Sequence, residues 1–273
     1  MFWPTVELAA MVIVVRGIGD VGSAVAHRLF TAGYRVVIND GPTPMTTRRG
    51  MSFADAVFDG HAILDRVHAV RAHDLVRVRE ALGAGRAIAV YVRDIGSLVA
   101  GVCPTVLVDA RIQKHSRPEV QHGLAPLTIG VGPDLVAGRH ADVVIETSWH
   151  GLGEVITHGK TRPLSGEPRE IAGHGRDRYV YAPIDGVFRT KARIGDTVRR
   201  GQEVAAISSL VLVAPLDGVL RGLTRDGVPV AGGAKVVEVD PRIDGPEIYG
   251  IGERPRLIAE SVLVAIREHR RSG

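Results

Sequence analysis

The chain has 273 residues, and at roughly 150 residues per domain this predicts one large domain with a smaller companion. Apolar residues make up 45% and charged residues 23%, which is typical of a globular protein and excludes a chain that is disordered throughout. Aromatic residues reach only 4%, too few for the stacked rings that hold single-stranded nucleic acid. The basic residues behind the net charge of +4 are scattered, so we expect no nucleic-acid partner.

Residues 11–15 are a continuous apolar run rich in β-branched side chains, typical of a strand buried on both faces of a parallel sheet. A glycine turn, a helical pattern over 20–32 and a second strand at 35–38 complete a βαβ unit. A helical pattern follows at 75–82, and strand-like runs recur at 87–92, 105–108, 126–131 and 143–145. The sequence therefore predicts an α/β fold with a Rossmann-like, mostly parallel sheet over residues 11–177.

The next part of the chain contains an internal repeat. Residues 182–207 align with 214–239 at a spacing of 32, with 11 identities in 26 positions. Each copy predicts strand, turn and strand, and neither can bury its apolar face alone. We therefore expect two interlocked copies in a small all-β domain over 178–240. The C-terminal segment, 241–273, contains an apolar stripe that predicts an amphipathic helix at 257–267.

The single cysteine, Cys103, excludes an internal disulfide and a cysteine-based zinc site, and it suits a reducing compartment. Cys103 precedes Pro104 in an apolar stretch, so we expect a small buried side chain. Residues 8–15 are too few to span a membrane and lack the basic flank of a signal peptide. We expect a cytoplasmic protein that binds no membrane.

The segment Gly17-Ile18-Gly19-Asp20-Val21-Gly22 is a G-x-G-x-x-G that follows a strand and opens a helix. Gly17 permits the turn, Gly19 lets backbone amides approach a ligand, and Gly22 lets the helix pack on the strand. Asp40 lies 40 − 17 = 23 residues after Gly17, where an acid can bind a ribose hydroxyl. Asp20 suits the helix dipole but repels a pyrophosphate, so a tight turn without a dinucleotide is the alternative.

Other candidate ligand-binding residues follow the later strands. They are Asp94, Asp109, Arg111, Lys114, Gly130, Gly132 and Glu146. Parallel strands deliver their carboxyl ends to one edge, so we expect Asp109 and Arg111 to converge with Asp40 beside the glycine turn. An ordinary ion pair at the strand end is the alternative for Asp109 and Arg111.

Six segments together resemble the accessory-protein family of selenium-dependent molybdenum hydroxylases, the YqeB type. They are 14–20, 25–29, 108–111, 129–133, 145–147 and 182–186. The resemblance implies a Rossmann domain like that of the XdhC maturation factors, which handle the molybdenum cofactor. The resemblance implies a family pattern that begins near Met11, so we expect residues 1–10 to be an N-terminal extension.

The chain departs from the family pattern at two places. Ser148-Trp149-His150-Gly151 stands where an Arg-Gly-His is expected after Thr147, which puts an anion contact there in doubt. Gly22 replaces an alanine, which brings this chain closer to the dinucleotide fingerprint.

The repeated half resembles the barrel-sandwich hybrid of biotinyl and lipoyl carriers, through residues 194–198 and 201–204. Those carriers modify a lysine in the hairpin between the halves. Here residues 207–211 contain no lysine, so we expect no swinging arm.

We interpret the chain as an accessory or maturation factor for a molybdenum-containing hydroxylase, and leave open whether it catalyses a reaction. It would bind a molybdenum pterin cofactor, or an NAD(P)- or FAD-type dinucleotide, at the glycine turn. Its partners would be the client hydroxylase, a nucleotide-bearing small molecule and, in a homo-oligomer, a second copy. The alternatives are an NAD(P)-dependent oxidoreductase, with His150 or Lys114 as proton donor, and a non-catalytic interaction module.

Overall fold

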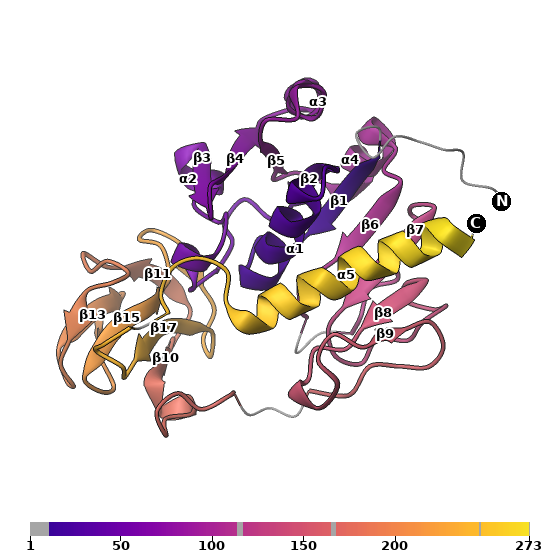
Figure 1. Ribbon diagram of the computed structural model, residues 1–273. Coiled ribbons are helices and arrows are strands. Elements are labelled where there is room, and N and C mark those ends of the chain that lie inside the picture. The colour runs from indigo at the N-terminus through magenta and orange to yellow at the C-terminus, as the bar shows by residue number, and fades with distance from the viewer. Residues whose placement is uncertain (1–10, 114–116, 165–167, 246, 273) are drawn as a thin grey trace. The chain divides into compact units, whose positions relative to one another are not determined.

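The computed structural model describes residues 11–113, 117–164, 168–245 and 247–272 (Figure 1). The chain divides into two compact units, which we call the sheet unit (1–42, 52–165 and 251–273) and the repeat unit (43–51 and 166–250). These units differ from the predicted ranges 11–177, 178–240 and 241–273, because a short internal segment and the residues flanking the repeat also pack into the repeat unit. The proposed extension, residues 1–10, lies outside the described residues.

The sheet unit contains a nine-stranded mixed sheet. Its parallel strands stand in the order β4-β5-β2-β1-β6-β7-β8, and β3 and β9 pair antiparallel at the two edges. The strands are β1 (Val12–Arg16), β2 (Arg35–Asn39), β3 (His61–Leu64), β4 (Val67–Ala72), β5 (Ile88–Tyr91), β6 (Val106–Asp109), β7 (Leu127–Val131), β8 (Val143–Ile145) and β9 (Val155–Ile156). The order β5-β2-β1-β6-β7-β8 is that of a doubly wound dinucleotide-binding sheet, in which the direction of winding reverses between β1 and β6. The predicted α/β class and parallel sheet are confirmed.

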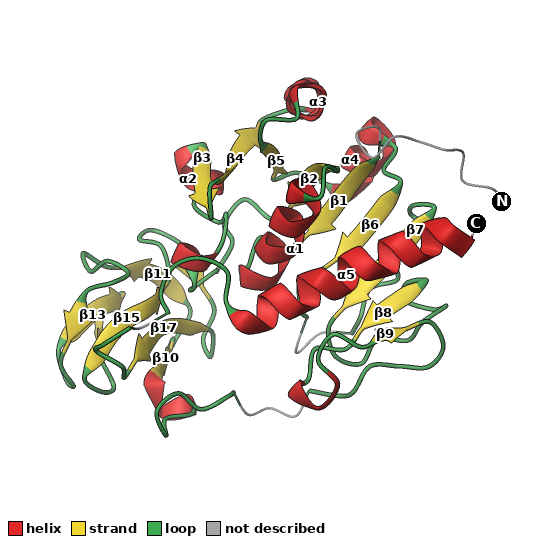
Figure 2. Ribbon diagram, viewed as in Figure 1, coloured by secondary structure: helices red, strands yellow, loops and turns green. Residues whose placement is uncertain are grey.

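Helices cover both faces of this sheet (Figure 2). The first face carries α1 (Asp20–Thr31) and α5 (Glu253–Ser272), and the second carries α3 (Leu75–Ala84) and α4 (Ile95–Val102). The described parts of the β6–β7 and β7–β8 connections contain no helix, and α5 packs beside α1 against β8 and β9. The predicted C-terminal helix is thus confirmed, and it completes the layer that crossover helices would otherwise form. No described helix is both long enough and apolar enough to cross a bilayer.

The repeat unit consists of two four-stranded antiparallel sheets, β10-β17-β15-β12 and β14-β13-β11-β16. The first copy forms β11 (Gly186–Arg189), β12 (Thr197–Val198) and β13 (Glu203–Ile207). The second forms β15 (Gly218–Leu223), β16 (Pro229–Val230) and β17 (Lys235–Asp240), each starting 32 residues later. The remaining elements are β10 (Tyr179–Tyr181), β14 (Leu210–Val213), α2 (Ala56–Asp59) in the sheet unit, and short 3-10 helices at Arg49–Met51, Trp149–Gly151 and Arg176–Arg178.

The two copies exchange strands reciprocally. Gly186 of β11 pairs with Val230 of β16, and Gly218 of β15 pairs with Val198 of β12. The two pairs are equivalent under the 32-residue repeat, because 186 + 32 = 218 and 230 − 32 = 198. The predicted interlocking of two copies is therefore confirmed, whereas the barrel-sandwich assignment stays a prediction.

A fully buried carboxylate, that of Glu238, lies in the repeat unit, with 0% of the side chain exposed. It accepts hydrogen bonds from Arg48 Nε at 2.9 Å, Arg178 Nη1 at 2.5 Å and Lys235 Nζ at 2.8 Å. Burial alone would raise the pKa of Glu238, but the charges of Arg48 and Lys235 hold it well below the ordinary value. Arg48 belongs to segment 43–51, so this segment supplies part of the charge that makes the buried carboxylate tolerable.

We expect Glu238→Gln to lower the stability of the repeat unit by about 3 kcal/mol or more, because buried cations lose their shared counter-charge. Asp226→Asn is the matched control, since Asp226 pairs at 3.5 Å with Arg189, the repeat equivalent of Arg221, on an exposed surface. The control should cost less than about 1 kcal/mol. Urea unfolding followed by circular dichroism measures both, and equal effects would contradict the structural role of Glu238.

The start of α1 depends on a close contact between two glycines. Gly17 adopts φ +106°, and a Cβ on Gly22 would overlap the Gly17 carbonyl oxygen. A Cβ on Gly19, in contrast, would meet nothing within 4 Å. Glycine at position 22 therefore permits this close backbone approach.

We expect Gly22→Ala to destabilise the sheet unit by about 2 kcal/mol or more, because the helix must move off the strand to admit the methyl group. Gly19→Ala adds the same methyl group in open space and should cost less than about 1 kcal/mol. Thermal unfolding of the two variants checks this, and an unchanged melting temperature for Gly22→Ala would disprove the close contact.

Candidate ligand-binding site

The glycine turn connects β1 to α1 at the point where the winding of the sheet reverses. Gly17 N–H donates to the Asn39 carbonyl at 2.8 Å, and a Cβ on Gly17 would lie 3.0 Å from the backbone of Ala110 and Arg111. Gly19 is the N-cap of α1 and, having no side chain, gives the helix no cap hydrogen bond. An uncapped helix start with open space beside it is suited to an anionic group, because first-turn amides lack partners within the helix.

Two acidic side chains accept hydrogen bonds from backbone N–H groups at this turn. Asp40 Oδ2 accepts from the Ile18 N–H at 2.7 Å, and its Oδ1 accepts from the Gly41 N–H at 2.6 Å. Asp20 Oδ1 accepts from the Val21 N–H at 2.9 Å in the first turn of α1. The structure thus places Asp40 beside the turn, where it fixes the loop. Its binding of a ribose hydroxyl stays a prediction.

A network of charged side chains lies at the carboxyl ends of β1 and β6. Arg111 donates two parallel hydrogen bonds to Asp109, Nε to Oδ1 at 2.9 Å and Nη2 to Oδ2 at 2.6 Å. Its Nη1 donates to Glu119 Oε1 at 2.9 Å. Arg16 Nη1 donates to Glu119 Oε2 and to Gln121 Oε1, both at 2.9 Å. The strand-end pairing of Asp109 and Arg111 is therefore present, and Glu119 bridges it to Arg16.

The arginines also shift the ionisation of this network. Hydrogen bonding from Arg111 is the largest cause that lowers the pKa of Glu119, to about 2. For Arg111, burial opposes the charged form, but hydrogen bonds to Asp109 and Glu119 outweigh it and raise the pKa further. Glu119 and Arg111 are therefore both ionised near neutral pH.

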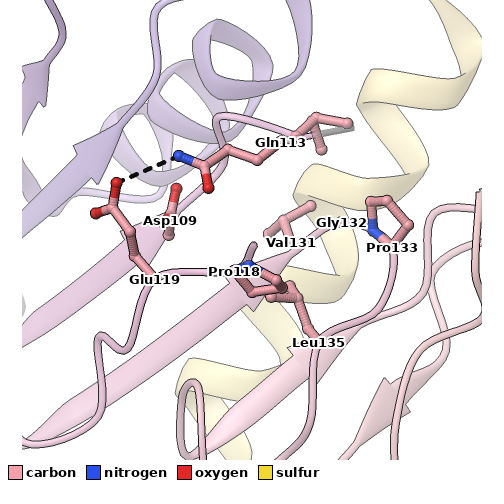
Figure 3. A pocket seen from close by; sticks show the side chains of 9 residues that line it. Asp109, Gln113, Pro118, Glu119, Val131, Gly132, Pro133 and Leu135 are labelled. Atoms are coloured by element: carbon pink, nitrogen blue, oxygen red, sulfur yellow. Dashed lines mark hydrogen bonds between the residues drawn. The ribbon is translucent and has the colours of Figure 1, made fainter. Parts of the chain in front are cut away.

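A small cavity of about 20 Å³ borders the network, and a space of this size holds about one water molecule. Asp109, Glu119, Gly132 and Pro133 are among its lining residues. Figure 3 shows the carboxylate of Glu119 next to Asp109 and Gln113, with a hydrogen bond of 3.4 Å from Gln113 Nε2. The structure thus brings Gly132 to the same end of the sheet as Asp109.

The remaining predicted site residues have roles in their own loops. Gly130 is buried, and a Cβ there would approach Leu135 to 3.0 Å, whereas Gly132 adopts φ +150°. Glu146 is also buried, and its carboxylate accepts from the backbone N–H groups of Thr147 and Ser148 at 2.7 Å and of Arg162 at 2.6 Å. These contacts organise the loop after β8. Ligand contact by any of them stays a prediction.

The other singled-out residues differ in outcome. His150 is exposed in a 3-10 turn, Asp94 caps α4 by accepting from the Ser97 N–H at 2.6 Å, and Lys114 lies outside the described residues. The expectation of a buried Cys103 is wrong. Cys103 is exposed because it ends α4 in the left-handed conformation, with φ 45°. No group of three or more His, Cys, Asp or Glu side chains able to hold a metal ion occurs among the described residues.

The sequence interpretation missed Arg16 and Glu119. A signal for Arg16 existed, because it is the charged last residue of an otherwise apolar, buried strand. Glu119 carried no comparable signal, since its pairing with Arg16 spans 103 residues and depends on a loop.

Acid should weaken the contribution of Glu119 to stability. Its pKa in the folded protein, about 2, is below the ordinary 4.5, so its stabilising effect is complete above the unfolded value and is lost as pH falls toward 2. We expect the stability difference between the native chain and Glu119→Gln to shrink from pH 6 to pH 3 in urea unfolding. A difference that is constant over this range would contradict the ion network.

No protein-family profile matches the chain. The chain is 35% identical over 267 residues to a protein of Escherichia coli (strain K12) named "Uncharacterized protein YqeB". The match covers 97% of this chain and 49% of that protein, so the chain spans about half the length of this curated relative. The predicted similarity to a YqeB-type protein is confirmed.

Solved structures give weaker likenesses. A succinylglutamatedesuccinylase/aspartoacylase from Rhodobacter sphaeroides is 24% identical over 34% of this chain and 26% of that chain, with a TM-score of 0.23. The product-bound Ectoine utilization protein EutE (DoeB) from Ruegeria pomeroyi is 12% identical over 84% of each chain, with a TM-score of 0.25. TM-scores this low do not indicate a shared fold.

Proposed function

We propose that this chain is an accessory or maturation factor for a molybdenum-containing hydroxylase, and that it binds a nucleotide-bearing molybdenum pterin, or a dinucleotide, at the glycine turn. The observation that carries the proposal is the uncapped helix start at Gly19, at the reversal point of a doubly wound sheet. The motif segments that resemble the YqeB type, and the similarity to YqeB over 97% of the chain, support the choice of client.

The glycine turn fits the phosphate end of such a ligand. The place of a Cβ on Gly19 is empty to 4 Å, so a phosphate can approach the start of the helix, where the Val21 N–H already donates to Asp20. Asp40, anchored to Ile18, is held beside the turn and is the candidate for a hydroxyl of the ligand. The pterin nucleotide would be the cargo of such a factor, so the residues of the turn need only bind and release it.

Native mass spectrometry of freshly purified protein tests the proposal directly. A retained pterin nucleotide supports a delivery factor. A retained nicotinamide dinucleotide with a spectral change on reduction indicates an NAD(P)-dependent oxidoreductase instead. Failure of every added pterin and dinucleotide to bind would leave a non-catalytic interaction module and refute the proposal.

We expect Gly19→Val to abolish binding of the retained ligand while leaving the fold intact, because the branched side chain fills the approach to the amides. Gly83→Val is the matched control, since Gly83 lies on α3 and a Cβ there also meets nothing within 4 Å. Calorimetry should show lost binding only for the first variant. If Gly19→Val bound the ligand with native affinity, the binding site would have to lie elsewhere than at this turn.

A further inference from the structure

Arg16 is an unusual end for a buried strand. It is the last residue of β1, its side chain is only 11% exposed, and its Nε has no hydrogen-bond partner among the described residues. A buried N–H without a partner carries an unrecovered desolvation cost. Arg16 therefore lies at the reversal point of the sheet with hydrogen-bonding capacity that its described partners do not use.

The acceptor now shared by Arg16 and Arg111 is supplied by a half-exposed side chain. Glu119 is 49% exposed, and its two carboxylate oxygens accept hydrogen bonds from Arg111 Nη1 and Arg16 Nη1, each at 2.9 Å. Two guanidinium groups converging on one oxyanion match the way proteins hold phosphate and carboxylate groups. Glu119 therefore has the chemistry of a ligand group, while the two arginines are anchored at the strand ends.

The arginine pair is continuous with the glycine turn. Gly17 directly follows Arg16, and a Cβ on Gly17 would lie 3.0 Å from Arg111 Cα. The Ala110 N–H also donates to the Arg16 carbonyl at 2.8 Å. A ligand on the turn would consequently have the arginine pair as its neighbour along the β1–β6 edge.

Charge balance indicates which kind of group fits. Arg16 and Arg111 together oppose Asp109 and Glu119, so this four-residue set is neutral when Glu119 is in place. Asp109 already fills the Nε and Nη2 side of Arg111. Withdrawal of Glu119 alone would leave one net positive charge, which a phosphate or carboxylate group can neutralise.

We propose that Arg16 and Arg111 form an anion subsite for a phosphate or carboxylate group of the ligand, and that Glu119 occupies this subsite until the ligand displaces it. The identity of the complete ligand rests on the function proposed above, whereas the subsite itself requires only an anion. Because Glu119 has a pKa of about 2, a competing anion rather than a proton must displace it near neutral pH.

The test uses inorganic pyrophosphate as the probe and calorimetry on the full chain. Glu119→Gln and Glu119→Ala should bind pyrophosphate at least tenfold more tightly than the native chain, because the competing carboxylate is gone. Glu80→Gln is the matched control, since Glu80 pairs with Arg77 at 2.7 Å on the same unit. It should bind as the native chain does. Adding Arg16→Gln to Glu119→Ala should reverse the gain.

Unchanged pyrophosphate affinity in both folded Glu119 variants would overturn the subsite. A lower melting temperature of the Glu119 variants without tighter pyrophosphate binding would likewise overturn the subsite. Glu119 would then be a purely structural bridge. Tighter pyrophosphate binding with no retained pterin or dinucleotide would uphold the subsite and refute the proposed function. If a pterin or dinucleotide is retained and the Glu119 variants bind it with native affinity, the subsite alone is refuted.

Discussion

The close approach of Gly17 and Gly22 is the constraint on which the candidate site depends. With no side chain between them, α1 starts directly at the end of β1, and the start of the β6–β7 connection packs against Gly17. This packing brings Arg16 and Arg111, which are far apart in sequence, to one place. A looser turn would separate the helix start from the arginine pair, and the two could not serve one ligand.

Each unit holds a cluster of charges, and the two clusters differ in how completely the partners are enclosed. Glu238 is fully buried in the repeat unit and is paired with Arg48 of segment 43–51, Arg178 of a 3-10 helix and Lys235 of β17. Exchange of that carboxylate for a ligand would require opening the unit. Glu119 is half exposed, although Arg16 and Arg111 hold both of its oxygens, so its place can be taken without unfolding. Burial therefore separates a cluster suited to stability from a cluster suited to binding.

Periodicity predicted the regular elements, because strands such as β1 and helices such as α1 are set by apolar spacing within a few residues. It missed the β3–β4 hairpin, whose turn places Asp65 and Arg66 at positive φ without a glycine signal. It also missed α4, which contains two glycines. At the candidate site it paired Asp109 with Arg111, two residues apart, but not Glu119 with Arg16, because a loop conformation and not a local pattern brings that pair together.

The segment 43–51 gives the chain an interleaved architecture. The path leaves the sheet unit after Pro42, returns at Ser52, leaves again after Ser165 and returns at Ile251. Within the repeat unit this early segment accepts a backbone hydrogen bond from the Leu223 N–H at the Thr47 carbonyl, 2.8 Å away, and contributes Arg48. No single junction in the gene therefore separates the two units. In evolution, the repeat unit could be gained, lost or exchanged intact only together with nine residues encoded within the first third of the sheet unit.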